Sequence, residues 1–233
     1  MKFIKKTIAA LLISTFALSF VACGKTTYDK KKEQFIDICE SMDYEEIDQK
    51  KAKKYMDDLD ADWDGFYTSF EDSKTIKKLS EKFSSSSSSD VVSLFLASHK
   101  IIKNGSKHAI FIYIYELEDE DAAEDFYEDT LESLEEVTAP IYSTYDSLVD
   151  TGDVEIAVID KEKNDRYRFC YSIVSDDYDM DSFTSYDVIL EENTVTIIVG
   201  AVNVDNNKSI RSDYEDIYDG LDDKSPLEMV EWK

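Results

Sequence analysis

Residues 91–115, VVSLFLASHKIIKNGSKHAIFIYIY, predict a β-hairpin. The run 91–102 is rich in residues that favour strands, and the run 109–115 consists almost entirely of them. Asn104 and Gly105 lie between the two runs, and this pair is the strongest short-range sign of a tight hairpin turn, because both turn positions need a positive φ. We therefore expect the two runs to pair as antiparallel strands.

Hydrophobic spacing outside this hairpin predicts further strands and helices. Residues with strand propensity gather in four more segments: 44–47, 154–159, 167–174 and 186–204, the last broken by a turn at 191–193. Apolar residues at helical spacings mark 28–41, 49–59, 119–137 and 206–221, and one more helix is expected to end near residue 83. Helices grouped around an antiparallel sheet define an α+β fold.

The segment 49–90 is expected to be a helical, acidic insertion in this fold. Six consecutive serines, 84–89, close it, and a serine tract behaves as a flexible linker. We do not expect a domain boundary there, because residues 28–83 have few large apolar side chains for a core of their own. The chain from residue 30 to 233 is therefore expected to form one α+β domain that contains the insertion.

The first 22 residues have the pattern of a secretory signal peptide. Lysines give a positive start, an apolar run covers residues 8–18, and small residues precede Cys23. This run is too short for a spanning helix, which needs about 20 apolar residues.

The end of this segment, Ser19 to Cys23, resembles the lipobox of bacterial lipoproteins, with Phe20 where leucine is usual. In that class the cysteine receives a diacylglyceryl group and becomes the first residue of the mature chain. The resemblance implies that Cys23 is lipidated, that residues 23–29 form a short tether, and that the domain lies at the outer face of the cell membrane. Two acyl chains anchor a protein stably where one is marginal.

The charge of the chain limits its partners. It carries 26 basic and 52 acidic side chains, a formal net charge of −26 at pH 7, and the signal segment contributes only basic ones. Nucleic acids and anionic lipid headgroups would be repelled, so we expect no nucleic-acid partner. Cations and basic partners would be attracted. The alternative is that the charge only keeps an exposed protein soluble.

Residues 60–71 resemble the calcium-binding loop of an EF-hand. Their spacing fits the pattern D-x-[DN]-x-[DN]-G-x₅-E, with Gly65 at the sharp turn. The calcium ligands that this resemblance implies are Asp60, Asp62, Asp64, the Phe66 carbonyl and Glu71. Calcium is the one cofactor that the sequence suggests, and a solvated acidic loop between two helices is the alternative.

Cys39 and Cys170 are the cysteines left once Cys23 is lipidated. An exported compartment permits a disulfide between them. Cys39 shares the apolar face of its helix, whereas Cys170 alternates with the inward-facing residues of its strand. Their side chains should then point to different layers, so we expect two free thiols.

Signatures of catalysis are missing from the sequence. His99 and His108 flank the hairpin turn, but no third metal ligand is apparent, and no cysteine or serine has a recognisable nucleophile setting. The acids are too numerous for any pair to be singled out. The strand tyrosines are expected in the core, and the alternative is a solvent-facing aromatic cluster that binds a glycan or peptide.

Two passages resemble small lipoproteins of low-GC Gram-positive bacteria: residues 111–123, FIYIYELEDEDAA, and 192–195, ENTV. The resemblance covers the first helix and roughly residues 109–221, whereas 49–98 departs from it. It implies no catalytic residues. We therefore expect a membrane-anchored extracytoplasmic module that binds a protein or a cell-wall component. Two alternatives stay open, a calcium-binding surface lipoprotein and a carboxylate-dependent hydrolase.

Overall fold

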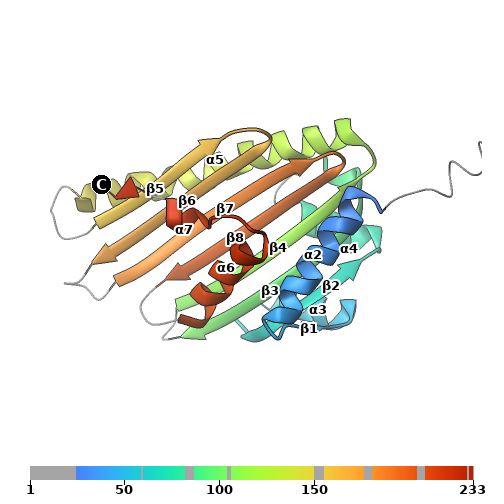
Figure 1. Ribbon diagram of the computed structural model, residues 1–233, viewed down its shortest axis with the longest axis horizontal. Helices are drawn as coiled ribbons and strands as arrows, with labels where there is room; N and C mark the ends of the chain where they lie inside the picture. The colour runs from blue at the N-terminus through green and yellow to red at the C-terminus, as the bar shows by residue number, and fades with distance from the viewer. Residues whose placement is uncertain are drawn as a thin grey trace, which may run out of the picture.

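The computed structural model describes residues 25–58, 60–81, 87–103, 106–149, 155–175, 180–203, 208–229 and 231–232. These residues form a nine-stranded sheet with helices on both faces, in the strand order β1-β2-β3-β4-β8-β7-β6-β5-β9 (Figure 1). Neighbouring strands are antiparallel, except β1 and β2, which are parallel. The predicted α+β class is confirmed. The signal segment and Cys23 lie outside the described residues.

The strands are β1 (Glu45–Glu46), β2 (Trp63–Phe70), β3 (Val91–Lys103), β4 (Ser106–Leu117), β5 (Glu155–Glu162), β6 (Arg166–Ser175), β7 (Met180–Glu191), β8 (Thr194–Asn203) and β9 (Glu231–Trp232). The helices are α2 (Thr27–Ser41), α3 (Gln49–Asp57), α4 (Ser73–Ser80), α5 (Glu120–Val149), α6 (Lys208–Gly220) and α7 (Pro226–Met229), with a 3₁₀ turn η1 (Ser87–Ser89). No helix in this part of the chain is long and apolar enough to cross a membrane.

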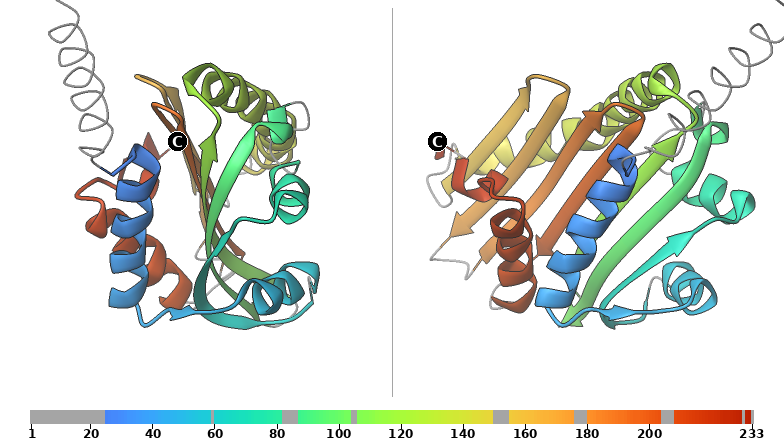
Figure 2. Two further views of the ribbon diagram at one scale, coloured as in Figure 1. Left: turned by 90° about the vertical axis from the view of Figure 1, so that its right-hand side faces the viewer. Right: turned by 45° about the vertical axis from the view of Figure 1, so that its right-hand side comes forward.

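Strand β4 shows why the sheet has helices on both faces. Successive side chains of a strand point to opposite faces. Ile110, Ile112 and Ile114 pack in one buried cluster with α2 and α6, whereas Tyr113 and Tyr115 pack in another with α3, α4 and α5. Both sets are apolar, so each face needs its own covering layer. Figure 2 shows α2, α6 and α7 on one side of the sheet and the other helices opposite.

The predicted hairpin is confirmed. Strands β3 and β4 pair in a regular antiparallel register from Lys103 opposite Ser106 to Ser93 opposite Glu116. Asn104 and Gly105 at the turn lie outside the described residues. On its other edge β4 pairs with β8, so residues 91–115 lie inside the sheet and not at its edge.

The segment 49–90 differs from the predicted helical insertion. Residues 63–70 form β2, which pairs with β3 and contributes Trp63, Phe66 and Phe70 to the core beneath α3. The segment is therefore part of the sheet and of the core. In the serine tract, residues 87–89 form η1 and the Ser88 side chain is buried, so this end is not an open linker.

A buried ionic cluster ties the end of the chain to the sheet. Asp187 on β7 is fully buried; it accepts a hydrogen bond from Arg166 Nε at 2.7 Å, and its Oδ2 lies 3.3 Å from Arg168 Nε. The Tyr218 hydroxyl donates to the same carboxylate at 3.0 Å. Asp223, just after α6, accepts from Arg166 Nη1 at 2.6 Å and also pairs with Arg168. The two arginines thus join β6 to the segment between α6 and α7.

We predict that Asp223→Asn destabilises the domain by about 1.5 kcal/mol at pH 7, because a charged hydrogen-bond acceptor is lost. Burial alone would raise the pKa of Asp223, but Arg166 and Arg168 hold it below the ordinary value. This contribution is therefore fully present above the pKa of the unfolded chain and is lost as the pH falls through the lower, folded pKa. Urea unfolding at pH 7 and pH 3 measures it.

The matched control for this prediction is Asp222→Asn, at the exposed neighbouring position with φ 53°. Asparagine tolerates such a φ as well as aspartate does. An equal loss of stability in both variants, or a loss in Asp223→Asn that does not shrink in acid, would contradict the role given to Asp223.

Candidate functional site

A partly exposed row of apolar side chains crosses the middle of the sheet on the α5 side. Phe111, Val199 and Tyr186 lie opposite one another on β4, β8 and β7, and we call these three residues the aromatic strip. All three are partly exposed, although they pack against the core. The same row continues to Phe66 on one side and to Phe169 on the other, and both of these are fully buried. The sheet is therefore covered at both ends of the row and open at its centre.

Aromatic side chains of the flanking helices pack on strand residues near the aromatic strip. Next to α3, Tyr55 stacks on Trp63 with ring centroids 5.7 Å apart, and Trp63 meets Phe111 edge-on at 6.4 Å. On the α5 side, Phe126 packs on Tyr115 at 4.9 Å. Helix α5 contacts β4, β8 and β7, and the strip packs against the core that α3 and α5 cover.

Small side chains form the next row on the same face. Ala109, Ala201 and Thr184 lie opposite one another on β4, β8 and β7. Lys100 ends this row on β3, where its Nζ lies 4.5 Å from the centre of the Trp63 ring, a cation–π contact. Burial lowers the pKa of Lys100, and so does nearby Lys107. The strip is thus flanked on this side by small side chains and by the buried Lys100.

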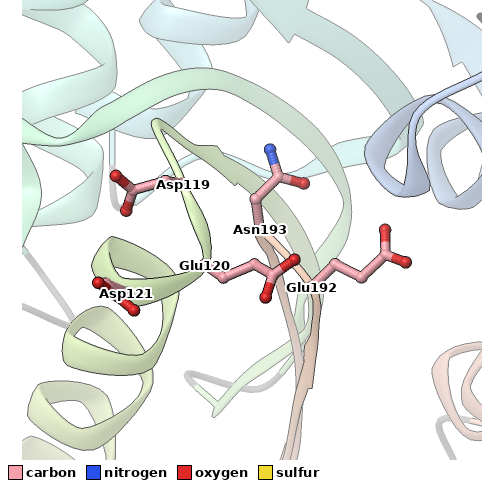
Figure 3. A pocket seen from close by; sticks show the side chains of 5 residues that line it. All are labelled: Asp119, Glu120, Asp121, Glu192 and Asn193. Atoms are coloured by element: carbon pink, nitrogen blue, oxygen red, sulfur yellow. The ribbon is translucent and has the colours of Figure 1, made fainter.

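An acidic hollow lies where α5 begins. It has a volume of about 390 Å³, and its side chains come from the start of α5 and from the turn between β7 and β8 (Figure 3). It is lined by Asp119, Glu120, Asp121, Glu192 and Asn193. Asp119 caps the helix by accepting a hydrogen bond from Ala122 N at 2.9 Å, and Glu192 accepts one from Thr27. These carboxylates stabilise the local structure, and those at the start of α5 interact favourably with the positive end of the helix dipole.

The structure contradicts the EF-hand conformation predicted for residues 60–71. An EF-hand loop turns sharply at its glycine, whereas here the chain runs extended through Gly65 as part of β2. Close packing explains the glycine instead, because a Cβ at this position would lie only 2.0 Å from the Tyr44 ring. Phe66, the expected carbonyl ligand, is a buried core residue of the same strand.

The implied calcium ligands are not gathered around one point. Asp60 Oδ1 lies 3.1 Å from Lys107 Nζ, and Asp62 Oδ1 accepts a hydrogen bond from Ile102 N at 2.6 Å. Asp64 lines a separate hollow of about 280 Å³ beside α3, and Glu71 is exposed beyond the strand. In the part of the chain that is described, no three His, Cys, Asp or Glu side chains are placed to hold a metal ion.

The two histidines share one face of the β3–β4 hairpin without forming a metal site. His99 lies opposite Ile110, two residues along β4 from the buried His108. His99 Nδ1 is 2.6 Å from Asp213 Oδ2 on α6, and the Tyr44 hydroxyl donates to the same oxygen at 2.9 Å. Burial, and then the charge of Asp213, raise the pKa of Tyr44 well above its ordinary value, so its hydroxyl stays a donor. Asp213 therefore links α6, β3 and the segment after α2.

Cys39 and Cys170 are buried free thiols, but the predicted reason is wrong. Cys170 lies opposite Ser185, whose hydroxyl is close to Gly200 together with Tyr214 of α6. It therefore faces the α2 and α6 side, as Cys39 does. Sideways distance separates them instead. Helix α2 packs on β2 and β4, and three strand spacings from β4 to β6 amount to about 14 Å, beyond the reach of a disulfide.

Comparisons with known proteins show no family for this chain. No protein-family model matches it, and no curated protein does. Among solved structures, the extracellular domain of PknH from Mycobacterium tuberculosis is similar to 76% of this chain over 92% of its own, with 6% sequence identity and a TM-score of 0.35. A likeness this distant assigns neither a function nor a site.

We predict that two thiols titrate in the mature protein only after it is unfolded. Burial raises the pKa of both Cys39 and Cys170 to about 12, so little reactive thiolate forms in the native state. A thiol-reagent assay without reductant, run with and without denaturant, measures this. A chain in which no thiol appears after denaturation would contain the disulfide and would contradict the separation of the two cysteines.

Proposed function

We propose that this protein is a lipid-anchored extracytoplasmic module without catalytic activity, which binds a partner protein through the aromatic strip. The observation that carries the proposal is the partly exposed row of Phe111, Val199 and Tyr186 between the buried residues Phe66 and Phe169. Exposed apolar patches mark interaction sites, and aromatic rings bury a large area at little entropic cost. The anchor itself rests on the lipobox that ends at Cys23.

Charge supports a basic partner. The chain carries a net charge of −26, so a basic surface would be drawn to it and an acidic one repelled. The strip itself is apolar, so the partner should place an apolar side chain there, while its basic charge is attracted by the acidic chain as a whole. A protein segment with this composition fits better than a neutral wall glycan.

Catalysis has less support than binding. The most buried carboxylate, Asp187, is held by two arginines and a tyrosine, and Asp213 is held by His99 and Tyr44. Side chains paired in this way are fixed in the structure and are poor candidates for a general acid or base. Calcium binding in EF-hand form is not part of the proposal, because residues 63–70 form a strand.

We predict that Val199→Lys abolishes partner capture, lowering the retained amount at least tenfold, because a lysine at the centre of the strip puts a charge into an apolar contact. The measurement is crosslinked capture from envelope extract on the mature protein, at low and at high salt. The matched control is Val137→Lys on α5, where the valine is already 51% exposed. Thermal unfolding checks that both variants fold, and Tyr186→Ser tests the same strip without adding a charge.

Two results would overturn this assignment. One is equal capture of the same partner by Val199→Lys, Tyr186→Ser and the unchanged protein. The other is capture of a wall glycan with no protein bound.

For the anchor, we predict that Cys23→Ser releases the protein into the medium or leaves its signal segment uncleaved, because no acyl chains can be attached. Cell fractionation and the mass of the N-terminal peptide measure this. Cys39→Ser is the control, since it removes a thiol and leaves the lipobox intact. Full membrane retention of Cys23→Ser would show that Cys23 is not the anchor.

A further inference from the structure

The start of the folded domain is fixed to one end of the sheet. Helix α2 begins at Thr27, and its N-cap Thr26 forms a capping box with Asp29. The Thr27 hydroxyl donates to Glu192, and Lys31 Nζ lies 2.8 Å from Glu191, both at the turn between β7 and β8. The first helical turn is therefore held against this turn of the sheet. Figure 1 places the start of α2 at this end.

Covalent geometry limits how far this end can be from the lipid. Four peptide steps separate Cys23 from Thr27. A fully extended chain spans at most about 3.6 Å per residue. The start of α2 therefore lies within about 14 Å of Cys23, whatever path the tether takes. The predicted tether 23–29 is in fact shorter, because its last three residues belong to α2.

We infer that the protein stands on the membrane in a fixed sense, with the start of α2, the β7–β8 turn and the start of α5 next to the lipid headgroups. This inference rests on the proposed lipidation of Cys23. The opposite end of the sheet, where β3 meets β4, then points away from the membrane. Strand β4 runs between the two ends, and at about 3.4 Å per residue its length is about 37 Å.

The orientation gives the aromatic strip a definite height. Phe111 lies six residues from the membrane end of β4 at Leu117, which corresponds to about 20 Å. The strip therefore stands clear of the headgroups and opens sideways. Its partner is a protein beside the anchored chain, in the same membrane or in the space above it, and the lipid itself is excluded.

The surface turned to the membrane carries charges of both signs. Asp119, Glu120, Asp121 and Glu192 line its hollow, whereas Lys25 and Lys30 are exposed at the start of α2, so this end offers no uniformly basic surface to anionic headgroups. The acyl chains must supply the adhesion, and this end should rest against the surface without inserting.

Depth-dependent quenching tests the orientation. The mature lipidated protein carries one fluorescent probe, either at Asp121→Cys at the near end or at Lys107→Cys at the far end, both of them exposed positions. Burial of Cys39 and Cys170 keeps the label on the introduced thiol. In phosphatidylcholine vesicles that contain a nitroxide-headgroup lipid, we expect quenching to be severalfold stronger at position 121 than at position 107.

A lengthened tether is the matched control. Twenty Gly and Ser residues inserted after Gly24 give the tether a root-mean-square span of about 25 Å, so quenching at position 121 should fall severalfold while the protein still floats with the vesicles. Equal quenching at both positions of the floating protein would overturn the orientation. Failure to float would instead overturn the lipid anchor, so the two failures are distinguishable.

Discussion

Burial of apolar side chains on both faces of the central strand is the constraint on which the rest of the structure depends. Strand β4 places Ile112 on one face and Tyr113 on the other, and both side chains are buried away from water. At about 25 cal/mol per Å² of apolar surface, each face needs a layer of its own. The chain meets this demand with α2 and α6 on one side and α3, α4 and α5 on the other. All other elements extend the sheet or connect these layers.

Local pattern was enough to predict the elements that have one clear period. The hairpin, α2 and α6 follow from residues close in sequence, and they lie within a few residues of their predicted bounds. Strand β2 was missed because acids at every second position around Trp63 fit a strand edge and a calcium loop equally well. What decides between them is tertiary: Tyr44 covers Gly65, and Trp63 Nε1 donates to Ser98 on β3. Neither contact is visible in a local window.

The candidate site was harder to predict than the fold, for a related reason. The sequence shows that β4, β7 and β8 are apolar, but it does not show which part of a face the helices leave open. That Tyr113 and Tyr115 are buried while Tyr186 is partly exposed depends on where α5 crosses the sheet. The ionic cluster also joins residues that are far apart in the sequence, since Arg166 and Asp223 are 57 residues apart. Long-range geometry therefore decides both features.

The two faces of the sheet differ in how firmly they are closed, and this difference favours one of them for binding. Helix α6 is held by Asp213 near its middle and by Tyr218 near its end, with apolar Ile217 between these polar contacts. Buried polar pairs of this kind are costly to break, so the α6 side has one defined arrangement. The opposite face has no comparable pairing across the aromatic strip in the described residues, and its central side chains are only partly covered. A partner could cover the partly exposed apolar side chains there, whereas on the α6 side it would first have to displace a helix that already covers the sheet.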